Sequence, residues 1–505
     1  MPEHLEPGHE LIVGATRSGK SFLTLYRIMR SFRSERPLCF IDPRGDGYRH
    51  LLSWFACHPV GQQTLAAYSD RIVLVNPVSP APYRVGFNAI GPLEAFDEAK
   101  PDLISLLASG LVSHLRRQYG ADWGETNRYE GILTAAIGAL VEGGEGMYTL
   151  AEIPQLLTPS TDSDGKSTGF YPFLNLLLRK VTHPGTRIFF DNEWRTMNPH
   201  SKREWVEPVN SRVLKYLFDQ RLLTTLCTTS AKGTLDFRRV LRDGLWLFVN
   251  LPYQYLSEFG TTLIGNLIVS RLQNAGLQEP PRQFPYRIIL DEGRFFATGP
   301  VDVITETTGK YNLWLSLLVQ SLEQLTRGAE SIGLYKTLLN NSRYVFAFNS
   351  EADDEALADL LFPVTGRVEM GRRKSGNFLY DAASYNPIFL PVEAERDANR
   401  RKLSGLAPRQ FYFFDRFSRD GARLLTGPWV DLPTQVDSIK LAKLEADHLR
   451  RTGQPVADIE DEIRYRRLAV DRIIAQDFGA GPVKRPARGP KQSGRSPAPD
   501  FGEER

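Results

Sequence analysis

The sequence has few cysteines and no long apolar run. Its 505 residues include three widely spaced cysteines, which fit neither a disulfide framework nor a zinc site: Cys39, Cys57 and Cys227. No apolar stretch approaches the ~18 residues of a membrane-spanning helix. The polar, acidic start Met1–His4 does not resemble a signal peptide. These absences predict a cytoplasmic protein in a reducing compartment, which would reach a membrane only through a partner.

The sequence also lacks a strong excess of charge of one sign. There are 62 Lys and Arg residues against 59 Asp and Glu, which gives a formal net charge of +3. Dedicated nucleic-acid binders often carry a strongly basic domain. Any DNA-binding surface here must therefore be local, such as a basic ring inside an oligomer. The hydrophobic share of 42% and the charged share of 24% are typical of a soluble protein, and the length is enough for several domains.

The first segment, residues 1–90, alternates short apolar strands with helix-length stretches. Strands are expected at Leu11–Gly14, Leu38–Asp42 and Ile72–Asn76, and a helix at Ser18–Ser34. Strands that alternate with helices form βαβ units and a parallel sheet. We therefore predict an α/β fold, with the first part of a nucleotide-binding domain in this segment.

Residues 91–242 have apolar residues at helical spacing, and they predict a mostly helical insertion. A polar loop is expected at Thr158–Thr168, and the one strand-like run is Arg187–Phe190. The residues that carry the helical spacing are Leu103, Leu106, Leu107, Leu111, Ile132, Ala135, Ile137 and Leu140.

The sheet is expected to resume in residues 243–434, the second part of the nucleotide-binding domain. Val364–Phe389 is polar and Gly-rich, and predicts a loop. Residues 435–478 predict C-terminal helices interrupted near Gly453, and residues 479–505 predict a disordered basic tail. The expected strands, the last two forming a hairpin, are Leu245–Asn250, Arg287–Leu290, Leu313–Val319, Arg343–Phe348, Gln410–Phe414 and Ala422–Thr426.

A phosphate-binding motif follows the first expected strand. Eight residues match G-x-x-x-x-G-K-[ST] in full: Gly14, Ala15, Thr16, Arg17, Ser18, Gly19, Lys20 and Ser21. The glycines let backbone N–H groups approach phosphates. Lys20 reaches the β- and γ-phosphates and so takes part in catalysis, while the Ser21 hydroxyl binds Mg²⁺. A strand before the motif and a helix after it favour an ATP site over the alternative, a phosphate-binding relic.

Polar residues at two later strand ends fit the catalytic half of such a site. The strand Arg287–Leu290 is followed by Asp291, expected to hold Mg²⁺ through water, and by Glu292, expected to polarise the attacking water. A solvated strand end is the alternative. Gln320 follows the next strand, where a polar side chain can sense the γ-phosphate. The alternative for Gln320 is a cap for the next helix.

Several short motifs follow one another in a specific order along the chain. They are Phe40–Asp46, similar to D-P-K-G-[DE]; Arg71–Asn76 with Gly86–Ile90, similar to r-i-x-v-x-[ND]-P and g-F-N-P-L; Gly244–Pro252, similar to G-x-x-L-x-V-x-L-P; Gln320–Leu325, similar to Q-S-x-x-Q-L; and Asn340–Asp353, similar to N-x-x-x-R-I-x-F-x-V-x-S-x-x-D. This order resembles the FtsK–HerA superfamily of ATPases, and most closely the TraG/TraD-type conjugative coupling proteins. Ala89 stands where that family usually has proline, and the last motif is one residue short before its Arg.

The resemblance implies a RecA-like P-loop fold and a ring, usually a hexamer, that hydrolyses ATP at subunit interfaces and moves DNA through its centre. It supports Gln320 as the γ-phosphate sensor. It also offers Arg343 as an arginine finger that reaches the γ-phosphate of a neighbouring subunit. A surface charge at a strand edge is the alternative for Arg343, and Arg409 and Arg221 are poorer candidates for the finger.

Some features of the family are not evident in the sequence. Coupling proteins normally begin with transmembrane helices and HerA-type proteins with a β-barrel, whereas thirteen residues precede this P-loop. The winged DNA-reading domain of FtsK is not evident either, so we expect a partner to recruit this motor to DNA or a membrane. The candidate phosphate contacts, with a solvated surface as the alternative, are Lys310, Arg294, His114, Arg116, Arg117, Arg128, Lys484, Arg485, Arg488, Lys491 and Arg495.

Three functions fit the sequence. The first is a ring-forming, ATP-driven DNA translocase in conjugative transfer by type IV secretion or in a related mobile-element process. The second is a motor for a protein substrate. The third is an ATP-dependent scaffold that activates a partner such as a nuclease in a defence-type complex. ATP and Mg²⁺ are the expected cofactors, and a relaxase, a secretion channel or a nuclease is the expected partner.

Overall fold

The structure is a computed structural model. It describes residues 6–91, 108, 110–112, 127–162, 164–230, 232–278, 284–296, 299–325, 331–350, 355–375, 384–418, 420–434 and 436–476. His114, Arg116, Arg117 and the predicted basic tail lie outside these residues, as does the side chain of Arg128. Within the described part of the chain, no helix has the length and apolar character needed to cross a membrane.

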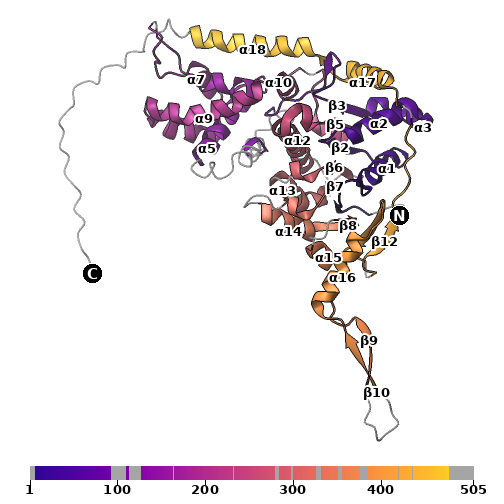
Figure 1. Cartoon of the computed structure of the whole chain (residues 1–505). Coiled ribbons are helices and arrows are strands. Elements are labelled where there is room, and N and C mark those ends of the chain that lie inside the picture. The colour runs from indigo at the N-terminus through magenta and orange to yellow at the C-terminus, as the bar shows by residue number, and fades with distance from the viewer. Residues whose placement is uncertain are drawn as a thin grey trace, which may run out of the picture.

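A nine-stranded sheet forms the centre of the molecule (Figure 1). The strands from β8 to β3 run parallel, and β11 and β12 are antiparallel additions at one edge. This arrangement confirms the predicted α/β class with a mostly parallel, RecA-like sheet. In spatial order the strands are β12 (Arg423–Thr426), β11 (Gln410–Asp415), β8 (Ser342–Phe348), β1 (His9–Val13), β7 (Leu313–Val319), β6 (Tyr286–Leu290), β2 (Leu38–Asp42), β5 (Trp246–Asn250) and β3 (Ile72–Val75).

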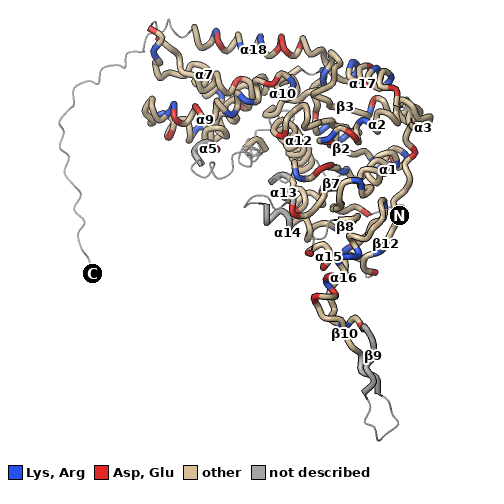
Figure 2. Tube along the Cα trace, in the orientation of Figure 1, with Lys and Arg blue, Asp and Glu red and all other residues tan. Residues whose placement is uncertain are grey.

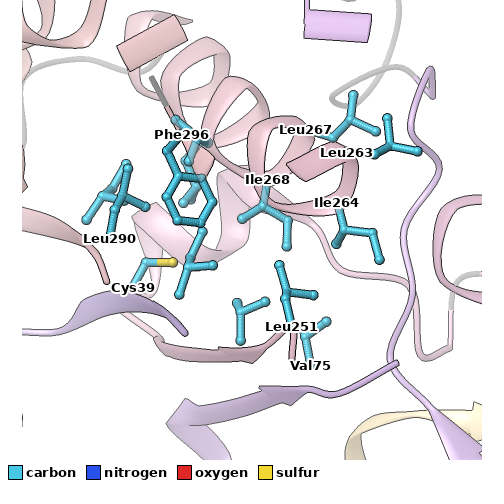
Figure 3. Close-up of a cluster of buried hydrophobic side chains, with 14 of the residues drawn as sticks. Cys39, Val75, Leu251, Leu263, Ile264, Leu267, Ile268, Leu290 and Phe296 are labelled. Carbon is cyan, nitrogen blue, oxygen red and sulfur yellow. The ribbon is translucent and has the colours of Figure 1, made fainter. Parts of the chain in front are cut away.

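Helices cover both faces of the sheet, as a parallel sheet requires. α1 (Lys20–Arg33), α2 (Asp46–Cys57) and α3 (Pro59–Tyr68) lie on one side of the sheet in Figure 1, and α12 (Tyr253–Gln278), α13 (Gly299–Thr307) and α14 (Ser331–Asn341) on the other. The strands β1, β2 and β5 are buried along their whole length. Figure 3 shows apolar packing between α12 and the sheet, with Ile264 and Ile268 on the side of the helix that faces Cys39, Val75 and Leu251.

Helices dominate the described residues between 127 and 242. They are α5 (Asn127–Gly138), η3 (Ala139–Gly143), η4 (Leu150–Glu152), α6 (Ile153–Leu156), α7 (Pro172–Leu178), α8 (Pro184–Ile188), η5 (Phe189–Trp194), α9 (Pro199–Leu217), α10 (Gln220–Leu226) and α11 (Phe237–Arg242). The predicted strand at Arg187–Phe190 is wrong, because these residues lie in α8 and η5. The Pro184 ring favours a helix start there, and His183 accepts a hydrogen bond from the Thr186 N–H.

The C-terminal helices α17 (Ser438–Thr452) and α18 (Val456–Gln476) pack against distant parts of the chain. Between them β13 (Gln454–Pro455) pairs with β4 (Tyr83–Arg84). On α18, the nearly buried Arg466 forms ion pairs with Glu152 at 3.2 Å and with Glu462 at 2.6 Å. Figure 2 shows basic and acidic residues interspersed along α9 and α18, in keeping with the small net charge.

A β-hairpin projects away from the sheet (Figure 1). It consists of β9 (Glu369–Ser375) and β10 (Ser384–Phe389), which pair antiparallel. α15 (Glu355–Leu361) precedes the hairpin, and α16 (Val392–Ser404) follows it. The prediction of a loop over Val364–Phe389 is therefore wrong for these two strands. The sequence of these strands lacks the apolar alternation that marks a strand.

Candidate nucleotide-binding site

The loop between β1 and α1 contains the predicted P-loop, and two of its positions require glycine. A Cβ atom on Gly14 would lie 2.5 Å from the Cβ of Phe348. Gly19 has a φ of 112°, in the left-handed region that favours glycine, and a Cβ there would lie 3.0 Å from the Cα of Arg409. At both positions the backbone packs so closely against other residues that a side chain would not fit.

Neighbouring strands hold the loop in place through its backbone. The Gly14 N–H donates to the Val319 carbonyl at the end of β7, at 3.2 Å. The Ala15 N–H donates to the Asn349 carbonyl just after β8, at 2.6 Å. The loop is thus tied to the strand on each side of β1, while Thr16 and Arg17 at its tip remain exposed.

The start of α1 presents positive charge to this loop. Gly19 caps the helix without a side-chain hydrogen bond, and no acidic residue lies in the first turn. The ammonium of Lys20 donates hydrogen bonds to the carbonyls of Gly14 and, at 3.0 Å, of Ala15. Burial lowers the pKa of Lys20 to about 8, although Asp291 and Glu292 act to raise it. A helix N-terminus with a lysine in its first turn is well suited to bind an anion.

Asp291 follows β6 and lies in an acidic, buried environment. Its N–H donates to the Ile41 carbonyl of β2 at 3.1 Å. The pKa of Asp291 is raised to about 7, first by burial and then by the carboxylates of Asp42 and Glu292, against the opposing charge of Lys20. Crowded carboxylates of this kind favour a bound cation, which lowers the cost of keeping them ionised.

Glu292 is held in a strained conformation by three side chains. Its φ of 55° and ψ of 66° place a non-glycine residue in the left-handed region. Gln320 donates to both carboxylate oxygens, at 2.8 and 3.0 Å. Arg44 lies 3.1 Å from one oxygen and Arg294 lies 3.6 Å from the other. Such strain is common at functional sites, where the surrounding contacts fix the conformation.

Arg44 is the residue of this site that sequence reasoning missed. The available signal was the motif Phe40–Asp46, which contains Arg44 but does not reveal its neighbour. The motif's Asp42 has a structural role, because its carboxylate accepts the backbone N–H groups of Arg44, Gly45 and Tyr48, each at 2.9 Å. These bonds shape the turn between β2 and α2 so that Arg44 meets Glu292.

Arg343 lies at the amino end of its strand, whereas the P-loop follows the carboxyl end of β1. In the parallel pairing of β1 and β8, Ser342 is level with His9 and Ala347 with Val13, so Arg343 is near the start of both strands. Its guanidinium pairs with Glu6 at 2.6 Å and with Asp415 at 3.4 Å. These contacts give Arg343 a structural role within the chain, and a role at a neighbouring subunit stays a prediction.

The remaining candidate basic residues are spread over the structure. Arg221 donates to the Tyr255 carbonyl at 2.6 Å. The Lys310 ammonium lies 5.1 Å from the centre of the Tyr311 ring. Arg294 lies beside Glu292, and its role as a DNA contact stays a prediction. Arg409 lies directly against the P-loop, where its N–H donates to the Ser18 carbonyl at 2.7 Å.

The residues present fit a nucleoside triphosphate and Mg²⁺. The hydroxyl of Ser18 is buried without a hydrogen-bond partner among the described residues, and the Lys20 ammonium lies against the carbonyls of the same loop. No cluster of three or more His, Cys, Asp or Glu side chains forms a metal site within the described part of the chain. This agrees with Mg²⁺ chemistry, because Mg²⁺ is usually held by one or two carboxylates together with phosphates and water. Ser21 and Asp291 are the residues that would hold it.

No protein-family model matches the sequence, and no curated protein matches it. The fold, in contrast, is similar to that of a bacterial conjugative coupling protein. The unbound form of TrwBdeltaN70 matches with a TM-score of 0.57 and 15% identity, over 86% of this chain and 88% of that chain. TrwB in complex with ADP and Mg²⁺ matches with a TM-score of 0.54 and 15% identity, over 85% and 87%. The chain therefore has the fold of the coupling protein TrwB, which confirms the predicted resemblance at the level of the fold.

Proposed function

We propose that this chain is an ATPase motor of the coupling-protein type, which binds Mg²⁺ and ATP at Gly14–Ser21. One observation carries the proposal: Gln320 and Arg44 hold the Glu292 carboxylate at the carboxyl edge of the sheet that also bears Lys20 and Asp291. An acid, a sensor and a phosphate-binding lysine at one sheet edge are the parts that phosphoryl transfer to water requires.

Each residue has a defined task in this proposal. Lys20 and the N–H groups of the loop bind the phosphates. Glu292 accepts a proton from the attacking water, and Gln320 links Glu292 to the position of the γ-phosphate. Mg²⁺, when bound through Ser21 and Asp291, neutralises phosphate charge. Because Arg44 and Gln320 fix the carboxylate, Glu292 does not have to reorganise when the substrate arrives.

We further propose that the motor acts as a ring, usually hexameric in such motors, and moves DNA. The fold supports this, because TrwB is described as a bacterial conjugative and plasmid coupling protein and has been solved with ADP and Mg²⁺ and with a non-hydrolysable ATP analogue. In such a ring Arg343 would reach the γ-phosphate of the neighbouring subunit. A small net charge of +3 is compatible with DNA binding if the basic residues gather in a channel.

The test is the rate of ATP hydrolysis with and without single- and double-stranded DNA, on protein separated by oligomeric state. We expect DNA to stimulate hydrolysis, and Lys20→Ala to abolish both ATP binding and hydrolysis. Hydrolysis that survives Lys20→Ala would contradict the assignment of the site. Rings that require ATP but do not respond to DNA would favour the scaffold function over the translocase.

The role of Arg343 is tested by mixing variants. Arg343→Ala should keep ATP binding and lower hydrolysis by about 10³-fold. Mixed with Lys20→Ala subunits, it should regain activity at interfaces that combine an intact P-loop with an intact Arg343. Asp415→Asn is the matched control, since it breaks an ion pair of Arg343 but leaves its guanidinium in place. If Asp415→Asn abolishes hydrolysis equally, or mixing restores nothing, the role in the neighbour is wrong.

A further inference from the structure

An arginine and an exposed tryptophan lie beside the P-loop on the side away from the catalytic residues. In the sheet, β1 has β7 and β6 on one side and β8 and β11 on the other. Glu292 and Gln320 follow β6 and β7. Arg409 precedes β11, and Trp429 follows β12, next to β11. The two groups therefore flank the P-loop from opposite sides.

Arg409 is fixed to the P-loop by its backbone. Its N–H donates to the Ser18 carbonyl at 2.7 Å, and its Cα is so close to Gly19 that a Cβ on Gly19 would lie 3.0 Å from it. Its φ of 70° is left-handed, which is unusual for a residue other than glycine. This strained backbone keeps Arg409 in contact with the loop that would hold the phosphates.

Arg409 also holds the segment that carries Trp429. The Gly427 N–H donates to the Arg409 carbonyl at 2.7 Å, and the Arg409 guanidinium donates to the Gly427 carbonyl at 2.8 Å. After Trp429 the chain returns to the core at Val430, which is 3% exposed. Trp429 is thus anchored on both sides, and its position relative to the P-loop is defined.

The Trp429 ring itself is largely open to solvent. The residue is 71% exposed, and the Arg409 guanidinium lies 5.1 Å from the ring centre. An aromatic ring that is exposed to water lacks the stabilisation that burial gives. An exposed tryptophan that is held in one position beside a binding site therefore points to a stacking partner. The cation over the ring restricts the ring further.

The geometry points to a role for Trp429 as the platform on which the purine base of the bound nucleotide stacks, with Arg409 as the residue that positions it. This inference rests on the proposed ATP site. If the γ-phosphate lies toward Glu292 and Gln320, the nucleoside must extend the other way from the P-loop, toward β8 and β11. Every base can stack on an aromatic ring, and a purine offers the larger face, so the site would bind purine nucleoside triphosphates modestly more tightly than pyrimidine ones.

The experiment is calorimetric titration of the full chain with ATP, CTP and inorganic tripolyphosphate. Trp429→Ala should weaken ATP binding by about tenfold, because stacking on one aromatic ring contributes on this scale, and should leave tripolyphosphate binding unchanged. Trp429→Phe should retain most of the affinity for ATP. The preference of the unmodified protein for ATP over CTP should shrink in Trp429→Ala.

The controls separate this inference from the proposed function. Tyr465→Ala removes another exposed aromatic residue, 72% exposed on α18, and should leave ATP affinity unchanged. If Trp429→Ala binds ATP as tightly as the unmodified protein, the stacking platform is wrong, while a loss of binding in Lys20→Ala still supports the ATP site. A change only in oligomeric state would show that Trp429 lies at a subunit interface and would also overturn the inference. If the unmodified protein binds neither ATP nor tripolyphosphate, the proposed function itself fails.

Discussion

Two buried glutamates of the central sheet are each faced by two arginines. Glu10 lies within β1 and is 1% exposed, and Glu292 follows β6 and is 5% exposed. Arg287 approaches one carboxylate oxygen of Glu10 to 2.9 Å, and Arg27 donates to both oxygens. Glu292 meets Arg44 at 3.1 Å and Arg294 at 3.6 Å. Residue types and burial therefore do not distinguish the two sites.

The partners and the backbone do distinguish them. The arginines of Glu10 are 16% and 17% exposed, whereas those of Glu292 are 37% and 38% exposed. Burial alone would raise the pKa of Glu10, but Arg27 and Arg287 outweigh it and hold that pKa below its usual value. The φ of Glu10 is not positive, whereas Glu292 is left-handed. A closed, unstrained ion pair supports the fold, and a more open, strained one holds its carboxylate in place for a substrate.

The largest expected effect is on catalysis at Glu292. Glu292→Gln keeps the shape of the side chain and one acceptor oxygen but removes the base, so kcat should fall by about 10³-fold while ATP still binds. ATP binding and single-turnover hydrolysis measure the two effects separately. Glu10→Gln, assayed cold enough to stay folded, should keep its kcat within about threefold. Normal hydrolysis by Glu292→Gln would show that Glu292 is not the catalytic base, and the two glutamates would then not differ in function.

The next effect is on stability at Glu10. Glu10→Gln leaves Arg27 and the buried Arg287 without their counter-charge, which should lower the free energy of unfolding by about 3 kcal/mol. Guanidinium unfolding would measure it. The matched control is Glu145→Gln, because Glu145 pairs with Lys180 at 2.9 Å while both are more than half exposed. That change should cost less than about 0.5 kcal/mol, and equal losses in the two variants would contradict the structural role of Glu10.

Much of this comparison depends on tertiary contacts that could not be predicted from the sequence. The strands of the sheet were predictable, because buried parallel strands are short, apolar and separated by helices. The P-loop was predictable from its spacing. The contact of Arg44 with Glu292 was not, since it depends on the turn after β2 meeting the turn after β6. The left-handed backbone of Glu292 was not predictable either, because glutamate seldom adopts a positive φ and no residue type in this stretch of sequence indicates one.

The smallest expected effect concerns His9, the neighbour of Glu10. Its ring is buried against Trp314, with centres 5.0 Å apart, and its Nδ1 accepts the Leu315 N–H at 3.1 Å. Burial, and after it the charge of Arg287, lower the pKa of His9 to about 4, against the opposing charge of Glu10. The unfolded chain would bind a proton near its usual pKa of 6.5. Between these values unfolding takes up a proton, so this residue makes the protein less stable as the pH falls.

His9→Asn, in which Asn can still accept the Leu315 N–H, should therefore weaken the loss of stability between pH 7 and pH 5, by at most about 2 kcal/mol. Denaturant unfolding at several pH values measures this slope. His448 is also buried with a pKa lowered to about 4, chiefly by burial, so part of the slope should remain in His9→Asn and should shrink again when His448 is replaced as well. Asp291, whose pKa is raised to about 7, contributes a slope of the opposite sign that both variants keep. His200→Asn, at an exposed position, is the control that should change nothing. A slope that is unchanged in His9→Asn would show that the ring is hydrated in solution, and the region around Glu10 would then be more open than its contacts indicate.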